Sequence, residues 1–429
     1  MKRTIAILGL LLALTAPACN RRSTASDQSF SAPVQLSPID RDAAEPTLAP
    51  APEGGAFLAW VDHQNGKADV MVARLDRGGA AVRPPTRVNP TAGMATAWRG
   101  DPPSLAVAPD GTLYVIWTSR TATPDETHAT DVLLSVSHDG GQTFSAPLRL
   151  NDDGKPADHG MHSLAVGGDG RVYAAWLDGR DPQPDIPMPE MKMAEGEKMP
   201  ADQKKIHNEG NREVFFTVSA DGGKTFSKNV RVASQVCPCC KTSLALAADG
   251  RVYVSWRQVL PGSFRHIAVT SSNDGGQTFA PPAIVSDDGW RLAACPVSGA
   301  AMDAGTDGHL RVMWYAAGEA GEIGVYQSES TNNGSSFTPR KLFAAGSSRG
   351  MPFFEAKSGA SLSVWEGGDG AATGIQFGLA KPNDDAAVTP QKIADGATPS
   401  ATRSEGQIFV AWVATKGEKR GVMLSRTAL

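Results

Sequence analysis

The side chains with the most distinctive chemistry in this sequence are four cysteines in two short segments. Cys237, Cys239 and Cys240 lie in one tetrapeptide, and Cys295 begins a second Cys-Pro pair. Thiolates are ligands for soft cations such as Cu(I), whereas cysteines in an oxidising compartment commonly form disulfides. The cysteines therefore predict either a metal or redox site, or structural disulfides in which Cys295 bridges one of the other three.

Histidine and methionine side chains that suit the same metal occur in nearby segments. Thioether and imidazole groups both bind copper, so copper is the cofactor that this set favours. Adjacent cysteines such as Cys239 and Cys240 are poorly placed to bind one tetrahedral zinc ion together. The candidate outer ligands are His159, His162, Met188, Met191, Met193 and His207. The last four belong to residues 178–210, a segment rich in Pro, Lys and Glu that predicts a loop insertion.

Seven apolar segments of strand length, each ending in tryptophan, set the frame for these residues. Most are apolar at both odd and even positions, which indicates strands buried on both faces between neighbouring sheets. A ring of radially packed, four-stranded antiparallel sheets meets that requirement, so we expect residues 29–429 to form an all-β, seven-bladed β-propeller. The tryptophans are Trp60, Trp117, Trp176, Trp256, Trp314, Trp365 and Trp412.

The two ends of the chain predict how this ring closes. The last copy of the repeat has room for three strands only, and the N-terminal segment 30–36 closely matches segment 144–150, the fourth strand of the second blade. An N-terminal strand that completes the last blade would remove the exposed sheet edges at the seam.

An octapeptide recurs at 137–144, 219–226 and 272–279, with the pattern Ser-x-Asp-Gly-Gly-x-Thr-Phe. It resembles the Asp-box, or BNR, repeat of the sialidase superfamily, which implies a propeller of sialidase-like type. In that family the aspartate accepts hydrogen bonds from loop amides and stabilises a turn. The resemblance therefore implies structural roles for Asp139, Asp221 and Asp274, away from the active site.

Strand alternation sorts the loops onto two faces. The Asp-Gly turns and the Asp-boxes share one face, and the loops that follow each tryptophan share the other with the connections between blades, which carry the cysteines. We expect this second face to bind a glycan, small-molecule or metal ligand, and the chain to be a monomeric binding module.

The family resemblance implies an alternative, an exo-alpha-sialidase that hydrolyses terminal sialic acid or another acidic sugar. Such an enzyme needs arginines that clamp the sugar carboxylate, a tyrosine nucleophile and acidic partners. The Phe/Tyr-Arg-Ile-Pro motif of the family is absent, because the corresponding region reads Ala44-Glu45-Pro46-Thr47-Leu48. A substitute set would consist of Arg180, Arg257, Arg291, Tyr315 and Glu366.

The N-terminus predicts export. Basic residues followed by a short apolar run indicate a signal peptide over residues 1–18, because the run is too short to span a bilayer. Small residues before Cys19 resemble a bacterial lipobox, which implies a lipidated Cys19, a linker over 19–28 and a periplasmic or outer-membrane lipoprotein, secreted across the inner membrane and bound to membrane through the lipid alone. A net charge of -4 with interspersed charges gives no indication of nucleic-acid binding.

Overall fold

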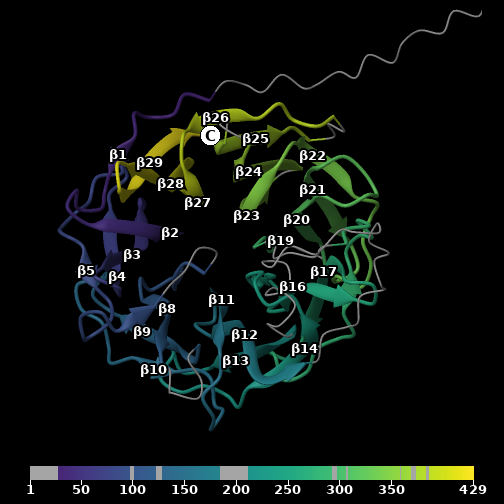
Figure 1. Cartoon of the computed structure of the whole chain (residues 1–429), viewed down its shortest axis with the longest axis horizontal. Coiled ribbons are helices and arrows are strands. Elements are labelled where there is room, and N and C mark those ends of the chain that lie inside the picture. The colour runs from purple at the N-terminus through teal and green to yellow at the C-terminus, as the bar shows by residue number, and fades with distance from the viewer. Residues whose placement is uncertain are drawn as a thin grey trace, which may run out of the picture.

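The computed structural model describes residues 28–96, 101–121, 128–183, 211–291, 297–305, 308–357, 359–368, 373–382 and 386–429. The described residues form β-strands joined by turns and loops, without a helix among them. Accordingly, no helix that could cross a membrane is found in this part of the chain. The strands belong to five antiparallel sheets, which Figure 1 shows arranged around a common axis.

Three of the sheets have four strands each. In the first, the order β1-β29-β28-β27 brings the two ends of the chain together. Its strands are β27 (Ala397–Ser404), β28 (Gln407–Lys416), β29 (Lys419–Ala428) and β1 (Val34–Gln35). The second comprises β19 (Ala300–Ala304), β20 (Leu310–Ala316), β21 (Gly324–Ser330) and β22 (Lys341–Ala345). The third comprises β23 (Ser348–Lys357), β24 (Ala360–Gly367), β25 (Gly374–Ala380) and β26 (Gln391–Ala394).

The two larger sheets each contain two successive four-stranded meanders. In the nine-stranded sheet, the short strand β6 pairs with both β4 and β8 and so joins the meanders. Its strands are β2 (Asp42–Pro50), β3 (Ala56–Gln64), β4 (Lys67–Leu75), β5 (Thr86–Arg87), β6 (Ala95–Thr96), β7 (Ser104–Val107), β8 (Leu113–Arg120), β9 (Thr130–Ser137) and β10 (Leu148–Arg149).

In the eight-stranded sheet, a single residue pair between β14 and β16 makes the corresponding connection. Its strands are β11 (His159–Val166), β12 (Val172–Gln183), β13 (Asn211–Ser219), β14 (Val230–Val236), β15 (Ser243–Leu246), β16 (Val252–Leu260), β17 (Phe264–Ser272) and β18 (Ala283–Ile284). The start of the predicted insertion, residues 178–183, thus continues β12.

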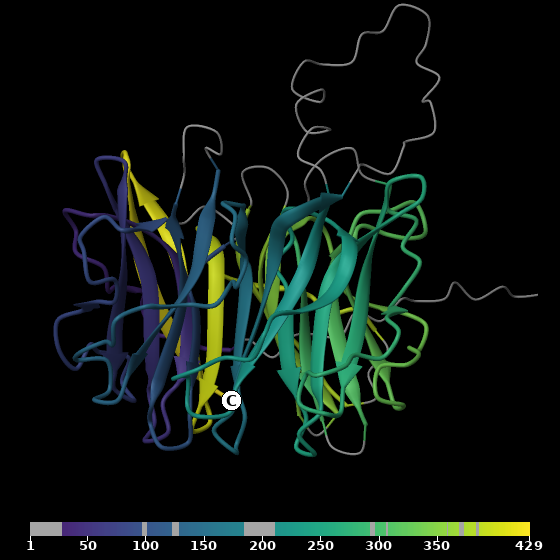
Figure 2. The same ribbon diagram turned by 90° about the horizontal axis from the view of Figure 1, so that it is seen from below.

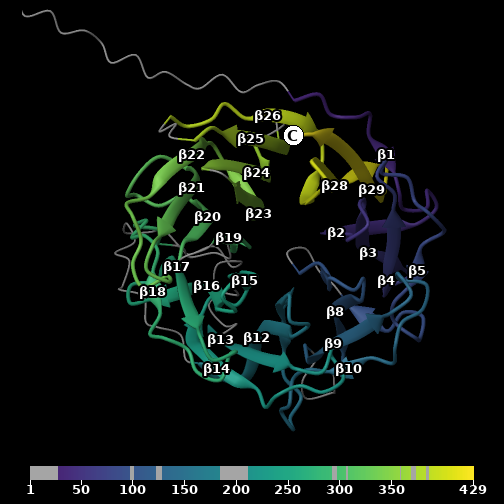
Figure 3. The ribbon, with the colours of Figure 1, turned by 180° about the vertical axis from the view of Figure 1, so that it is seen from behind.

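The first strand of each meander lies nearest the axis. Figures 1 and 3 show β11, β19, β23 and β27 toward the centre and β10, β14, β22 and β26 toward the rim. Seen from the side in Figure 2, the strands run roughly along the axis, so their connections lie at its two ends.

The predicted pairing of the N-terminal strand with the last sheet is confirmed. Val34 pairs with Leu424 and Gln35 with Met423. The backbone N–H of Leu36 also donates to the carbonyl of Val422 at 2.9 Å. Residues near the start of the described chain therefore complete the sheet that the C-terminal residues begin.

The tryptophans are the largest buried side chains, and the prediction that the strands end at them was wrong. The second strand of each meander continues beyond its tryptophan, as β16 does to Leu260. The indole of Trp256 donates to the Gln258 side chain at 2.7 Å, and Trp60 and Trp176 donate in the same way to Asp62 and Asp178. Because residues i and i+2 share a face of a strand, two further strand residues are needed to satisfy the buried indole N–H.

The Asp-boxes have the hydrogen bonds of a turn device. In the box at 272–279, Asp274 accepts the backbone N–H groups of Gln277 and Thr278, both at 3.0 Å, and the Thr278 hydroxyl at 2.6 Å. Asp139 and Asp221 make equivalent contacts. The hydrogen bonds from the threonine, above all, hold the pKa of each aspartate well below its usual range. These carboxylates are saturated by their own loops, and they stay ionised at neutral pH.

Gly276 provides a test of this turn. Its φ of 92° disfavours a side chain, and a Cβ there would overlap the Phe216 ring. Gly250 has a similar φ of 84° with open space around it. We expect Gly250→Ala to cost about 1 kcal/mol for the left-handed backbone and Gly276→Ala to cost about 1–3 kcal/mol more through overpacking. Thermal unfolding followed by circular dichroism measures the difference, and equal midpoints for the two variants would contradict it.

Candidate functional site

A cavity of about 300 Å³ lies between the innermost strands, and its wall includes residues of β2, β7, β11, β15, β19, β23 and β27. All seven meanders therefore contribute to one concave surface on the common axis. Ligand sites are commonly such cavities, with a few polar groups set among apolar ones. We refer to it as the axial cavity.

Irregularities in the innermost strands shape this wall. Glu45, Met161 and Thr398 have positive φ values of 53°, 52° and 48°. Each lies where the pairing of an inner strand with its neighbour shifts register. Such bulges re-aim side chains relative to a regular strand, and here they bring Glu45 and Thr398 to the cavity wall.

Hydroxyl groups near these bulges link the inner strands of neighbouring meanders. The Ser400 hydroxyl of β27 accepts the backbone N–H of Leu48 of β2 at 3.0 Å, where the C-terminal and N-terminal meanders meet. Ser104 donates to the carbonyl of His162 at 2.9 Å, and the hydroxyls of Ser163 and Thr242 lie 2.9 Å apart. The inner strands are thus connected by side-chain hydrogen bonds where backbone pairing ends.

The charged groups of the cavity wall differ in how far they are already paired. The Lys241 ammonium lies 3.4 Å from the Asp101 carboxylate, and burial lowers the pKa of Lys241. The buried Glu45 carboxylate lies 2.8 Å from His63 and 3.7 Å from Arg420. Arg349 is exposed and has neither a hydrogen bond nor an ion pair from its side chain to another described residue. Arg349 is therefore the cation of this wall that is available to a ligand.

The described cysteines gather beside the cavity, between β14 and β15. The Sγ atom of Cys237 lies 3.6 Å from that of Cys239 and 3.8 Å from that of Cys240, and all three residues are buried. Cys237 and Cys240 are free thiols. The next residue is Lys241, which lines the axial cavity. These three cysteines come from one tetrapeptide, whereas Cys295 lies outside the described residues, so the predicted four-cysteine set stays a prediction.

The environment of Cys237 favours a thiolate. The hydrogen bond from Cys240 lowers the pKa of Cys237 to about 6, despite burial, and the charges of Arg265 and Arg257 act in the same direction. Burial and the same hydrogen bond raise the pKa of Cys240 well above its usual value. The pair therefore shares one proton at neutral pH.

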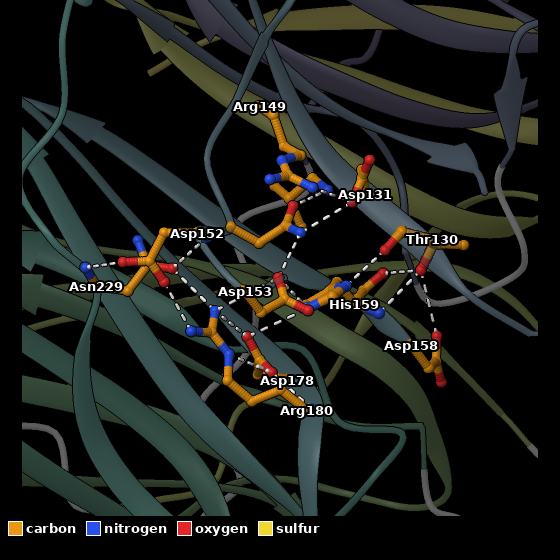
Figure 4. A network of polar contacts seen from close by, with 12 residues as sticks. Thr130, Asp131, Arg149, Asp152, Asp153, Asp158, His159, Asp178, Arg180 and Asn229 are labelled. Carbon is orange, nitrogen blue, oxygen red and sulfur yellow. Dashed lines mark hydrogen bonds and ion pairs between the residues drawn. The ribbon is translucent and has the colours of Figure 1, made fainter. Parts of the chain in front are cut away.

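The two described histidines of the predicted outer ligand set have other partners. Figure 4 shows His159 between two carboxylates, with its Nε2 atom 3.4 Å from both Asp153 and Asp178. Its Nδ1–H donates to the carbonyl of Thr130 at 2.5 Å. His162 is buried with its Nδ1 atom 2.8 Å from the Ser104 hydroxyl. The remaining candidate ligands, Met188, Met191, Met193 and His207, lie outside the described residues, as does Cys19.

The five residues of the alternative catalytic set are spread over several sheets, and none of them lines the axial cavity as the described residues define it. Arg180 is held by Asp178 and Asp152, at 2.9 and 2.7 Å. Arg257 is fully buried and donates to the backbone carbonyls of Ser298, Arg265 and Tyr315. The hydrogen bond from Arg257 to Tyr315 is therefore to the backbone carbonyl of Tyr315.

The other three members contact different neighbours. Arg291 stacks over the Phe264 ring at 4.7 Å, and the Tyr315 ring packs edge-on against Trp290 at 5.4 Å. The buried Glu366 carboxylate accepts the backbone N–H of Thr398 at 2.8 Å. Each of these side chains has a packing or hydrogen-bonding role, and the catalytic assignment stays a prediction.

Sequence reasoning missed Lys241 and Arg349. A partial signal marks the wall, because a proline followed by Ser or Thr recurs where β2, β7 and β27 meet the cavity, at Pro46-Thr47, Pro103-Ser104 and Pro399-Ser400. The segments that carry Lys241 and Arg349 lack this dipeptide, so it would not have identified these two residues.

Comparison with known proteins gives one family and a shared fold. Residues 56–369 match the family profile described as BNR repeat-like domain. An ulvan lyase bound to GlcA(1-4)Rha3S has 12% identity over 82% of this chain and 81% of its own, with a TM-score of 0.51. The NanB sialidase from Streptococcus pneumoniae has 11% identity, 88% and 84% coverage and a TM-score of 0.47. A protein of unknown function from Dyadobacter fermentans has 12% identity, 92% and 98% coverage and a TM-score of 0.48. No curated protein sequence matches the chain.

The two buried histidines predict opposite pH effects on stability. Burial alone would lower the pKa of His159, but Asp153 and Asp178 outweigh it and raise the pKa to about 10. Protonated His159 therefore stabilises the fold fully below its unfolded pKa of about 6.5, and this contribution is lost as pH rises through about 10. Burial lowers the pKa of His162 to about 4, so its contribution is present above about 6.5 and is lost as pH falls through about 4.

Urea unfolding of wild type, His159→Asn and His162→Asn across pH 4 to 10 tests these signs. We expect the stability difference between wild type and His159→Asn to shrink from pH 7 to pH 10. The stability difference between wild type and His162→Asn should instead shrink as pH falls from about 6.5 to about 4. Parallel pH profiles for all three proteins would contradict the assigned protonation states.

Proposed function

Because the chain belongs to the BNR repeat-like domain family and has its sialidase-like β fold, we propose that it is a ligand-binding module that holds an acidic glycan in the axial cavity. The observation that carries this proposal is the cavity itself, which draws on all seven inner strands and presents Arg349, a side chain without a polar partner among the described residues.

We further infer that the ring is a seven-bladed propeller. In favour of this, the two larger sheets each divide into two four-stranded meanders, which are joined by one residue pair in the eight-stranded sheet and by the two-residue strand β6 in the nine-stranded sheet. Together with the three four-stranded sheets, this division yields seven units, the number of buried tryptophans on second strands. The pairing of β1 with β29 supports closure by the N-terminal strand.

The chemistry of the wall favours a sugar with an acidic group. Ser104, Ser163 and Ser400 line the wall together with apolar residues such as Pro352 and Phe353. This mixture suits the polar edges and apolar faces of a sugar ring. The guanidinium of Arg349 can pair with a carboxylate or sulfate through two parallel hydrogen bonds.

Hydrolysis of terminal sialic acid or another acidic sugar is the alternative. Binding is preferred because Arg180 is already occupied by aspartates and Arg257 by backbone carbonyls, which leaves neither arginine free to clamp a sugar carboxylate. Turnover of a fluorogenic sialoside that falls strongly in Tyr315→Phe would favour the enzyme. Tyr315→Phe keeps the ring that packs on Trp290 and removes only the hydroxyl.

We propose that the module is attached to the bacterial envelope through a lipidated Cys19. The motif before Cys19 supports this location. When the full chain is expressed in a bacterium supplied with radiolabelled palmitate, we expect label in wild type and none in Cys19→Ser. Equal labelling of both proteins, or none in either, would contradict the anchor.

Arg349 provides the test of glycan binding. Titration of the full chain with N-acetylneuraminic acid and glucuronic acid, with glucose as the neutral comparison, should show binding of at least one acid. Loss of a charge-assisted hydrogen bond costs about 1.5–3 kcal/mol, so Arg349→Ala should weaken binding by roughly 10- to 100-fold. The affinity of Arg349→Lys should fall between that of wild type and that of Arg349→Ala.

Arg291→Ala is the matched control, because Arg291 stacks on Phe264 away from the residues that line the cavity. It should leave the affinity unchanged. Equal affinity of wild type and Arg349→Ala, or preference for glucose over both acids, would overturn the proposed ligand class.

A further inference from the structure

We propose that Cys237 and Cys240 form a binding site for a soft monovalent cation, Cu(I), beside the axial cavity. This site is separate from the glycan function, because neither cysteine lines the cavity. The two residues have the Cys-x-x-Cys spacing, lie in the short connection before β15 and are both free thiols.

The separation of the two sulfur atoms fits a bridging metal ion. Their Sγ atoms are 3.8 Å apart. An ion bonded to both at about 2.3 Å, a usual metal–thiolate distance, would subtend an S–metal–S angle of about 110°. Rotation of the cysteine side chains that moves the sulfur atoms slightly apart opens this angle toward the linear arrangement that two-coordinate Cu(I) prefers. A disulfide would instead require the sulfur atoms to approach to about 2.05 Å.

The number of ligands favours Cu(I) over Zn(II). A structural zinc ion takes four ligands in a tetrahedron. Among the described residues, the one group of three or more His, Cys, Asp or Glu close enough to share an ion is Cys237, Cys239 and Cys240. All three come from a single tetrapeptide, and Cys239 is not one of the free thiols. A pair of thiolates is sufficient for a thiophilic monovalent ion.

The charge around the site also fits two thiolates. Two thiolates with one Cu(I) carry a net charge of -1, which burial would penalise without a nearby cation. Arg257 is fully buried and donates to three neutral carbonyls, so no carboxylate offsets its charge through those hydrogen bonds. The buried Nε and Nη1 atoms of Arg265 have no hydrogen-bond partner in the described part of the chain. These two guanidinium groups can balance the bound cluster.

An apolar shell surrounds the thiols. Val236, Trp256 and Val259 pack in the same buried cluster as Cys237 and Cys240. A water-poor shell of this kind controls solvent access to a metal site, and it disfavours the hydrated Cu(II) ion relative to Cu(I). The structure therefore supplies soft ligands, balancing charge and a protected environment at one place.

The test is an anaerobic titration of the reduced full chain with Cu(I) against a chromogenic Cu(I) chelator. We expect one equivalent of Cu(I) per chain, and loss of this equivalent in Cys237→Ser and in Cys240→Ser. Removal of a group that supports the ligands typically lowers metal affinity by about 10- to 100-fold, so Arg265→Gln should weaken binding by that factor. Arg251→Gln, which changes an arginine at the opposite end of β16, should have no effect.

A second measurement on wild type does not depend on the folding of variants. The folded, reduced protein is treated with iodoacetamide with and without Cu(I), and it is then denatured and mass-mapped; Cu(I) should protect Cys237 and Cys240 from alkylation. If Cys237 and Cys240 are alkylated to the same extent with and without Cu(I), the proposed site is overturned. Tighter binding of Zn(II) than of Cu(I), or a Cys237–Cys240 disulfide that forms again before Cu(I) binds, would also overturn it.

Discussion

The structure depends on the burial of one indole per meander between neighbouring sheets. Trp60, Trp117, Trp176, Trp256, Trp314, Trp365 and Trp412 are at most 3% exposed, although each carries a polar N–H group. A buried donor without a partner is costly, and several of these indoles are satisfied by a side chain two residues along the same strand. This requirement extends the second strands beyond the tryptophan and fixes the identity of residues such as Asp178.

The same requirement explains the polar cluster around His159. Asp178 accepts the indole N–H of Trp176, and its carboxylate is buried. A buried carboxylate needs compensating charge, which Arg180 and protonated His159 supply from either side, as Figure 4 shows. Asp152 and Asp153 then balance the two cations. The charged groups of His159, Asp178 and Arg180 are thus paired with one another inside the fold. Their residue types and positions in the sequence had suggested a metal ligand and a substrate-binding arginine.

Much of the architecture could be predicted from the sequence, because repeats and turn motifs are local signals. The Asp-boxes, the second strands and the N-terminal strand that pairs with Leu424 all follow from short patterns. The cavity wall could not be predicted in this way. It is assembled from bulged inner strands that lie far apart in sequence. The residues with positive φ at the bulges, such as Glu45 and Thr398, are not the glycine or asparagine that usually indicates this conformation.

Cys237 and Arg257 show a second limit of sequence reasoning, which concerns charge. A run of cysteines indicates a metal or redox site. Whether these cysteines are stable as buried thiolates depends on nearby cations that come from other strands. Arg257 and Arg265 come from β16 and β17, and their charges lower the pKa of Cys237, which follows the pairing of β14 with β16 at Val236. The backbone N–H of Cys237 donates to the carbonyl of Arg257 at 2.9 Å, which fixes the cysteine segment against that strand.

Lys241 joins the cysteine segment to the axial cavity. It directly follows Cys240, and its ammonium reaches Asp101 and the carbonyl of Pro102 on the far side of the β11 inner strand. Its buried charge is held mainly by one carboxylate at 3.4 Å, so a second anion in the cavity would compete with Asp101 for it. The proposed Cu(I) site and the axial cavity are therefore neighbours, because one short connection before β15 supplies residues to both.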